Sequence, residues 1–210
     1  MTNIASGETL RSDLKIISDL IPPSSRVLDI GCGDGALLSF LAENKNIDAR
    51  GIELSQEGVN ACVAKGLSVI QGNADTDLID YPSNAFDYVV LSQTLQATRD
   101  PKEILTTLVR IGKNAIVSFV NFGHWRTRLS LMLHGRVPVP EKNGFNWYDN
   151  PDIHLCTILD FVDLCGNLGL KIDIGLSLDR NSRVRPIKSR SHTANLKGEQ
   201  AIFLLSPDAS

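Results

Sequence analysis

The stretch "VLDIGCGDG", residues 27–35, combines an apolar strand, a carboxylate inside that strand and a loop with three glycines. Gly31, Gly33 and Gly35 permit a tight turn and let a ligand approach the backbone closely. Residues 34–44 have the pattern of a helix, whose first N–H groups would point at the loop. A strand, a glycine loop and a helix in this order predict an α/β unit that holds a small ligand.

Two carboxylates in this stretch narrow the class of ligand. Asp29 and Asp34 would repel a phosphate held in the loop, at a cost on the order of several kcal/mol at intermediate dielectric. The glycine spacing is G-x-G-x-G, whereas dinucleotide-binding folds use G-x-G-x-x-G. Glu53 ends the next apolar strand, where doubly wound folds place an acidic residue that accepts hydrogen bonds from ribose hydroxyls. A cationic nucleoside such as S-adenosylmethionine fits these features, and a nicotinamide dinucleotide does not.

Apolar strands alternate with amphipathic helices along most of the chain, which predicts an α/β fold with a mostly parallel, seven-stranded sheet and helices on both faces. One helix, opened by Ser55, is expected to bury Val59, Cys62 and Val63. No helix is expected between the last two strands, so we predict that they form a terminal antiparallel hairpin at one edge. We expect a single domain over residues 1–210. The expected strands are 25–30, 49–54, 67–72, 86–92, 114–120, 170–178 and 200–205.

Composition excludes several classes of function. The net charge is −3, so no general attraction to nucleic acid is implied. The longest apolar runs are far shorter than a membrane span and the start has no signal-peptide pattern, so we expect a cytoplasmic protein without a membrane anchor. The four cysteines form no C-x-x-C pair, and no standard metal-ligand spacing is present, so no metal site is expected.

Residues 25 to about 120 resemble the class I S-adenosylmethionine-dependent methyltransferases, which implies a Rossmann-like fold of that class. The resemblance implies that loop 31–35 lies beside the methionine part of the cofactor, that Glu53 holds the ribose and that the "GNAD" stretch flanks the adenine. That family more often has aspartate at the position of Asn73, and Asp75 fits a loop aspartate equally well. The full set of implied cofactor-binding residues is Asp29, Gly31, Cys32, Gly33, Asp34, Gly35, Glu53, Leu54, Asn73, Ala74, Asp75, Ser92 and Gln93.

The segment after the fourth strand, "LSQTLQATRDP", contains no strong acid or base at the expected site. It lacks the [Asn/Asp]-Pro-Pro-aromatic loop of enzymes that methylate exocyclic amines or amides, which argues against nucleobase or glutamine-amide methylation. Gln93 and Gln96 can orient a substrate or simply cap the turn. His124 and His154 are general-base candidates by residue type, and each also fits a structural, hydrogen-bonded histidine. The sequence alone does not identify catalytic residues.

Two segments lie outside the generic methyltransferase pattern. Residues 121–150 follow the fifth strand and contain both tryptophans of the chain. This insertion fits a lid over a substrate, a surface for another protein, or a segment that packs on its own domain. Residues 180–198 are rich in lysine and arginine and contain no acidic residue, so we expect a basic hairpin loop that is solvated or meets an acidic partner.

Five stretches together resemble one narrower family, the bacterial MetW proteins of methionine biosynthesis. They are "VLDIGCGDG", "GIELSQEGVNACVAKGLSVIQGNADTDL", "FDYVVLSQTLQAT", "NFGHWRTRLSLMLHGRVPV" and "IHLCTILDF". The resemblance implies an accessory subunit with an S-adenosylmethionine-binding fold that partners and activates the MetX homoserine O-acyltransferase. The alternative is a methyltransferase that acts on a small molecule. A nicotinamide-dependent oxidoreductase is a third hypothesis, which Asp29 and the loop spacing disfavour.

Overall fold

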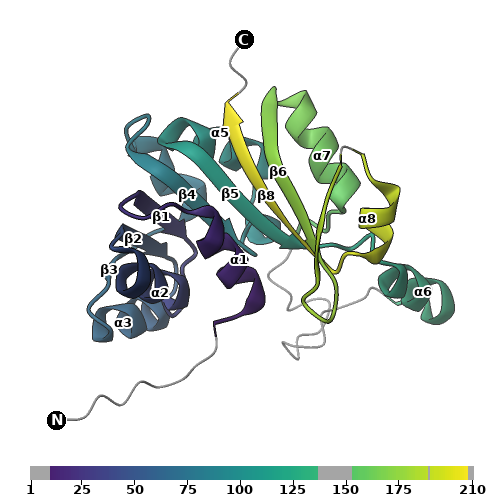
Figure 1. Ribbon diagram of the computed structural model, residues 1–210, viewed down its shortest axis with the longest axis horizontal. Helices are drawn as coiled ribbons and strands as arrows, with labels where there is room; N and C mark the ends of the chain where they lie inside the picture. The colour runs from purple at the N-terminus through teal and green to yellow at the C-terminus, as the bar shows by residue number, and fades with distance from the viewer. Residues whose placement is uncertain (1–9, 137–152, 189, 208–210) are drawn as a thin grey trace.

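An eight-stranded sheet forms the centre of the molecule, in the order β3-β2-β1-β4-β5-β8-β6-β7 (Figure 1). The computed structural model describes residues 10–136, 153–188 and 190–207. Strands β3 to β5 in this order run parallel to one another, and the β5–β8, β8–β6 and β6–β7 pairs are antiparallel. The strands are β1 (Arg26–Ile30), β2 (Asp48–Glu53), β3 (Ser68–Gln71), β4 (Phe86–Ser92), β5 (Gly112–Val120), β6 (Leu170–Leu178), β7 (Val184–Pro186) and β8 (Gln200–Pro207).

Helices begin where the sequence supplies a capping side chain. Ser55, Asp100 and Thr157 each accept a backbone N–H at the start of a helix, and Thr157 does so within a capping box with Asp160. The helices are α1 (Ser12–Leu20), α2 (Ala36–Lys45), α3 (Gln56–Ala64), α4 (Ala74–Asp77), α5 (Pro101–Ile111), α6 (Trp125–His134), α7 (Ile158–Asn167) and α8 (His192–Lys197), with short 3-10 turns η1 (Leu78–Asp80) and η2 (Leu95–Ala97).

The helices pack on both faces of the sheet and divide the core in two. On one face, α1 and α2 pack against alternate residues of β1, β4, β5 and β8, with Ile17, Leu41 and Ile116 fully buried. On the other face, α5 and α7 pack against the intervening residues, around a cluster of Phe119, Phe161 and Phe203. Successive strand residues point to opposite faces, so the two cores share the same strands.

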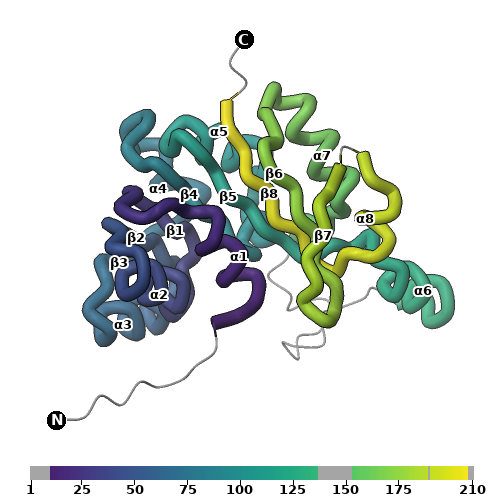
Figure 2. Tube along the Cα trace, in the orientation of Figure 1, coloured from purple at the N-terminus to yellow at the C-terminus, as the bar shows by residue number. Residues whose placement is uncertain are grey.

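The structure confirms the predicted fold class, and it corrects two details of the antiparallel end. β6 and β8 pair with each other, but β8 lies between β5 and β6 and is not an edge strand. The edge is an eighth strand, β7, which lies beside β6 in Figure 2. The expected basic hairpin loop 180–198 therefore contains β7 and α8. These elements have three and six residues, too few for a clear periodic pattern, and Pro186 is tolerated because β7 is an edge strand.

A further correction concerns α3, where Val59 and Cys62 are buried as predicted and Val63 is exposed. The helix packs beside β2 and β3 at the edge of the sheet, so that only a narrow stripe of its surface is covered.

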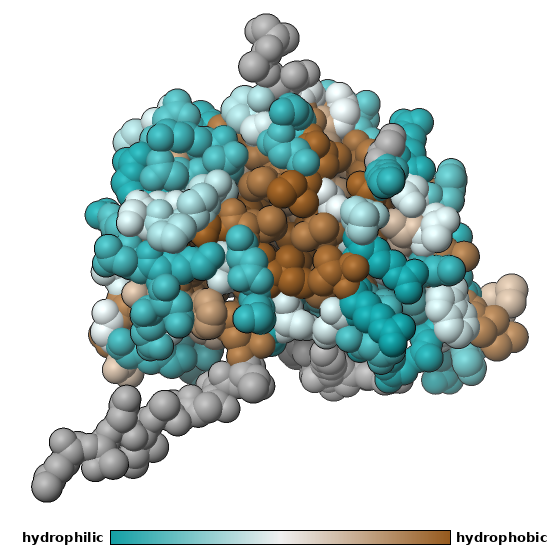
Figure 3. Space-filling view, in the orientation of Figure 1, coloured by the Kyte–Doolittle hydropathy of each residue, from teal (hydrophilic) through white to brown (hydrophobic). Residues whose placement is uncertain are grey.

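Figure 3 shows apolar side chains gathered over β8 and its neighbours beside α1, a region with half-buried Ile16, Leu20, Leu176 and Leu204. Within the described ranges, no helix has both the length and the apolar character needed to cross a bilayer.

Candidate functional site

A cleft of about 1600 Å³ opens at the carboxyl ends of the parallel strands. Gly31 follows β1, Glu53 ends β2 and Gln93 follows β4, and all three residues line the cleft. β1 and β4 are neighbours, while the chain continues from β1 to β2 on one side and from β4 to β5 on the other. This is the topological switch point of an open α/β sheet, where such folds bind their ligands.

The glycine loop is tight because all three glycines adopt positive φ angles, +72° at Gly31, +58° at Gly33 and +78° at Gly35. A Cβ atom on Gly31 would lie 2.6 Å from Oγ1 of Thr94, and one on Gly35 would lie 2.5 Å from Cδ1 of Leu67. The Gly31 N–H donates to the carbonyl of Ile52 at 2.8 Å, which ties the loop to the end of β2. The loop thus has the backbone conformation and the close contacts that glycine alone accommodates without strain.

Glu53 links the glycine loop to the end of β2. Its Oε2 accepts the N–H of Gly33 at 2.8 Å, and its Oε1 accepts the N–H of Ser55 at 2.8 Å. A carboxylate has about four acceptor positions, so both oxygens retain capacity for further donors. The side chain is fixed in orientation and lines the cleft, which is the geometry needed to accept hydrogen bonds from a pair of vicinal hydroxyls.

Asp29 lies in β1 beneath the loop and is only 3% exposed. Its Oδ1 has no hydrogen-bond partner among the described residues, which is rare for a buried carboxyl oxygen. Burial, reinforced by the charge of Glu53 and opposed by that of Arg11, raises the pKa of Asp29 to about 7. A positive charge in the cleft would favour the ionised form of this carboxyl group, so the residue fits a cationic ligand.

The structure does not bring Asp34 into the cleft. Its carboxylate forms an ion pair with Lys65, with Nζ and Oδ2 3.0 Å apart, and the same Nζ donates to the Asp34 carbonyl at 2.8 Å. Partial burial acts to raise the pKa of Asp34, but the hydrogen bond and charge of Lys65 outweigh it and lower the pKa. The loop backbone turns this side chain outward to the end of α3, so Asp34 is not available to attract a charge in the cleft.

The predicted cofactor-binding residues divide into two groups. Those that line the cleft are Gly31, Glu53, Leu54, Asn73, Ala74, Asp75 and Gln93. Those that lie outside its lining are Asp29, Cys32, Gly33, Asp34, Gly35 and Ser92. Within the second group, Cys32 packs against Leu38 and Cys62, and the Ser92 hydroxyl is 3.2 Å from that of Ser118.

The "GNAD" stretch forms the wall of the cleft beside β3. Asn73 caps α4 by accepting the N–H of Asp75 at 2.9 Å, and its own N–H donates to Asp77 at 2.9 Å. Asp75 accepts the N–H of Arg99 at 3.0 Å, which connects this wall to the segment after β4. Asn73 and Asp75 therefore both hold the local backbone by hydrogen bonds and also line the cleft.

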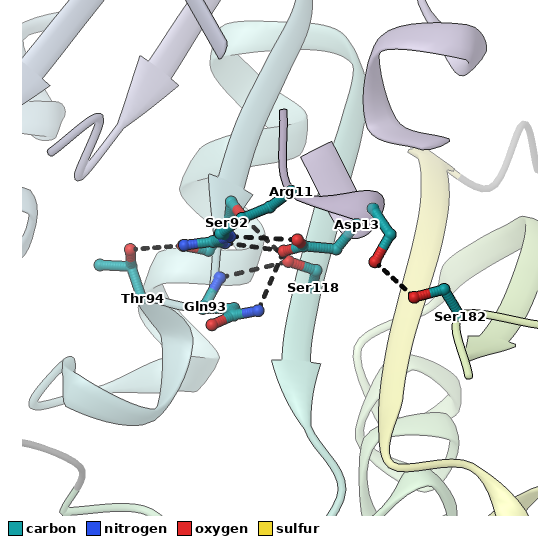
Figure 4. A network of polar contacts seen from close by, with 8 residues as sticks. Arg11, Asp13, Ser92, Gln93, Thr94, Ser118 and Ser182 are labelled. Carbon is teal, nitrogen blue, oxygen red and sulfur yellow. Dashed lines mark hydrogen bonds and ion pairs between the residues drawn. The ribbon is translucent and has the colours of Figure 1, made fainter. Parts of the chain in front are cut away.

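Sequence reasoning missed a polar network that connects α1 to the end of β4 (Figure 4). Arg11 donates to both carboxylate oxygens of Asp13, at 3.1 Å and 2.7 Å, and Gln93 donates its side-chain amide to the same carboxylate at 2.9 Å. The hydrogen bond with Asp13 raises the pKa of Arg11, and the negative charge of Asp29 acts in the same direction. Gln93 and Asp13 are 80 positions apart, so no local pattern signals their contact.

Gln93 and Gln96 hold the turn after β4, which is one of the two roles predicted for them. Gln93 has a positive φ of 54°, and its N–H donates to the Ser118 carbonyl at 2.9 Å. Gln96 is buried, its side-chain oxygen accepts the N–H of Val120 at 3.2 Å, and its carbonyl accepts the N–H groups of Ile153 and His154. Both glutamines also line the cleft.

The two histidine candidates are both engaged in hydrogen bonds. His124 caps α6 by accepting the N–H of Arg126 at 3.4 Å, and His154 places Nε2 3.1 Å from the Arg99 carbonyl. Burial lowers the pKa of His124, with Arg126 acting in the same direction and Glu199 against it. His124 lines the cleft and His154 does not. Of the predicted insertion 121–150, residues 137–150 lie outside the described residues.

A basic end of the cleft, formed by Arg126, His134, Arg136 and Arg180, was not predicted. The signal was present, because Arg126, Ser130 and His134 recur every four residues and therefore share one face of α6. None of these four basic side chains forms an ion pair with a described residue. Across the described ranges, no group of three or more potential ligands gathers to hold a metal ion.

The profile of a family described as Methionine biosynthesis protein MetW matches residues 11–205 of the chain. A bifunctional methionine biosynthesis protein MetXA/MetW from Rhodopirellula baltica is 33% identical over 211 residues, covering 95% of this chain. The match covers 33% of that protein, so the chain spans about one third of the length of this relative.

Solved structures share the fold at low sequence identity. A S-adenosylmethionine-dependent methyltransferase from Thermotoga maritima, described as a possible histamine N-methyltransferase, superposes with a TM-score of 0.67 at 18% identity, covering 93% of this chain and 87% of the other. The [4+2]-cyclase SpnF superposes with a TM-score of 0.64 at 17% identity, covering 95% and 80%. These likenesses show a Rossmann-like, methyltransferase-type fold, and the cyclase shows that the fold also carries other activities.

Proposed function

The chain belongs to the MetW family of methionine biosynthesis proteins, and from this premise we propose that it binds S-adenosylmethionine, or S-adenosylhomocysteine, and acts as an accessory subunit that activates a MetX-type homoserine O-acyltransferase. The ligand part of the proposal rests on the cleft at the switch point. The partner part rests on the relative in which the MetXA and MetW parts share one polypeptide. The two parts can fail separately, so each has its own test.

The single observation that carries the ligand proposal is the buried carboxyl group of Asp29, with its unpartnered oxygen, behind a cleft that Glu53 lines. Two acidic groups beside a glycine loop favour a nucleoside that carries positive charge over one that carries phosphate. S-adenosylmethionine has an ammonium and a sulfonium group and no phosphate. The solved methyltransferase of the same fold, described as dependent on this compound, supports the choice.

The residues of the chain have distinct tasks in this proposal. The loop at Gly31 lets the methionine part approach the backbone, Glu53 accepts the ribose hydroxyls, and Asn73, Ala74 and Asp75 flank the adenine. Asp29 favours the positive charge from beneath the loop. When bound, S-adenosylmethionine supplies an activated methyl group, but a subunit that only senses the compound needs the binding residues alone.

The partner proposal follows from the fused relative. A fusion keeps two parts at high effective concentration, which is useful for parts that work on each other. The match covers 95% of this chain and 33% of that protein, whose name joins a MetXA part to a MetW part. Cys32, Cys62 and Cys165 are buried thiols, which is consistent with the cytoplasm as the proposed compartment.

The alternative is a methyltransferase that acts on a small molecule. The volume of the cleft, about 1600 Å³, favours it, because ligand pockets are typically about 300–1,000 Å³ and room remains for an acceptor. Methyl transfer from a sulfonium depends largely on positioning, so the engaged state of His124 does not exclude it.

Calorimetric titration with S-adenosylmethionine tests the ligand part. We expect Glu53→Gln to weaken binding by about 10- to 100-fold, as the loss of a charged hydrogen-bond acceptor does. Glu57→Gln is the matched control, since Glu57 is an exposed acid four positions away on α3 and outside the cleft lining. Equal binding by both variants would contradict the role assigned to Glu53.

Two activity measurements separate the accessory subunit from the alternative. Adding the protein to the purified acyltransferase should raise acyl transfer to homoserine. Incubation with S-adenosylmethionine and a cell metabolite extract should leave S-adenosylhomocysteine at the background level. Steady production of S-adenosylhomocysteine, with no effect on the acyltransferase, would favour the small-molecule methyltransferase.

A further inference from the structure

Helix α6 projects from the body of the molecule (Figure 1), and four of its residues line the cleft. None of its ten residues is buried. All five of its large apolar side chains are therefore on the surface: Trp125, Leu129, Leu131, Met132 and Leu133, with Met132 74% and Leu133 65% exposed. Figure 3 shows apolar atoms at the edge of the molecule where α6 lies. Single exposed apolar residues are ordinary, but five on one helix of ten residues mark an interaction surface.

The base of α6 is held firmly even though the helix itself is exposed. The helix starts at buried His124, and Arg128 donates to the carbonyl of Gly123 at 2.6 Å. Just before it, Asn121 donates to the carbonyls of Asn195 and Gly198 at 2.8 Å and 2.7 Å. These bonds join the start of α6 to α8, so the helix is a fixed feature of the surface and its apolar side is presented in one direction.

A different side of α6 already has a task. Arg126, Thr127, Ser130 and His134 line the cleft, and the Arg126 guanidinium lies 5.2 Å from the centre of the Trp125 ring. The cleft therefore does not account for Leu131, Met132 and Leu133, which are outside its lining. A helix with tryptophan, methionine and arginine at its surface has the composition of an interface centre.

This inference rests on the proposed function. We propose that the apolar side of α6, formed by Trp125, Leu129, Met132 and Leu133, is the surface that docks the acyltransferase. The fused relative supplies the occupant, because 95% of this chain, α6 included, aligns with a protein whose remaining length holds the MetXA part. By helical spacing, Arg126 and Arg128 lie at the two edges of this side, although the chain as a whole carries a net charge of −3. The partner surface should therefore be an apolar groove with an acidic rim.

The test measures capture of the purified acyltransferase by the 210-residue chain on a sensor surface. Met132→Gln with Leu133→Gln should weaken capture by roughly tenfold or more, since interface hot spots lose at least that much. The matched control is Val63→Gln with Ile79→Gln, where Val63 is 58% and Ile79 is 70% exposed on α3 and η1. This control pair should change the dissociation constant less than about twofold.

Three further readouts keep the test decisive. Thermal unfolding of the α6 double variant should match the wild type, and a clear loss of stability would show that this side packs within the chain and would overturn the proposal. Equal capture by the two double variants would overturn it as well, as would a change in self-association alone, which would identify a second copy as the occupant. Wild-type protein that binds S-adenosylmethionine but captures no acyltransferase would refute the proposed partnership itself.

Discussion

The two ends of the cleft are built in different ways. At the strand end, Gly31, Glu53 and Asp29 are fixed by the backbone of β1 and β2, with Glu53 held by two N–H groups. At the helical end, Arg126 and His134 stand on α6, which has no buried residue, and they form no ion pair with a described residue. The strand end is preorganised for one ligand, whereas the basic side chains at the helical end are exposed on a fixed helix and can change rotamer when a ligand binds.

The first way to break this comparison is to disturb the strand end. Gly35→Ala should lower the free energy of unfolding by about 2–5 kcal/mol, because it combines left-handed strain with overpacking of a closed site. The new Cβ would lie 2.5 Å from Leu67 Cδ1 and 2.8 Å from Cys62 Sγ, at a φ of +78°. Urea unfolding measures the change.

Gly66→Ala is the matched control for Gly35→Ala. Gly66 has a similar φ of +74°, but a Cβ there would meet no atom within 4 Å. We expect a loss of about 1–2 kcal/mol from backbone strain alone. Equal losses at the two positions would show that the loop is not closely packed and would remove the rigidity that we assign to the strand end.

The second prediction uses the pKa of Asp29, which burial raises to about 7. Between about pH 4 and pH 7 the folded state holds a proton that the unfolded state has released, so stability falls as the pH rises through this window. Asp29→Asn should therefore stabilise the ligand-free protein at pH 8, on the order of 1–4 kcal/mol, with little effect at pH 4. Thermal unfolding across this pH range is the measurement, and an unchanged pH profile would contradict the assignment.

The third and smallest prediction sharpens the contrast between the ends. Arg126→Gln should leave the affinity for S-adenosylmethionine within about threefold, because an exposed basic group far from the loop is well screened. Titration at physiological salt measures it beside Glu53→Gln. A loss at Arg126 as large as that at Glu53 would mean that the ligand spans both ends of the cleft.

The strand end was predictable because its signals are local. The apolar run, the glycine spacing and the acidic end of β2 each follow from neighbouring residues, and Gly31 and Glu53 were found from them. The outward turn of Asp34 was not, because it depends on Lys65, which lies 31 positions further along the chain. The contact of Gln93 with Asp13 could not be predicted for the same reason, since the two residues are 80 positions apart in the chain.

The helical end was harder to predict because exposure is a tertiary property. Trp125, Leu129, Met132 and Leu133 recur at helical spacing, and α6 is present. The spacing could not show that this side is exposed among the described residues, since a helix packed on a core has the same pattern. β7 was not predicted for a related reason. Its three residues form a strand because they pair with β6, and so short a segment has no strand pattern of its own.

The central claim, that acidic groups at the strand end select a cationic nucleoside, is tested most directly by calorimetric titration at pH 8. The wild type and Asp29→Asn are each titrated with S-adenosylmethionine and, separately, with a nicotinamide dinucleotide. Two acidic groups at the strand end should select the cationic ligand, so we expect binding of S-adenosylmethionine by the wild type, about tenfold weaker binding by the variant, and no binding of the dinucleotide. Binding of the dinucleotide, with none of S-adenosylmethionine, would contradict the account.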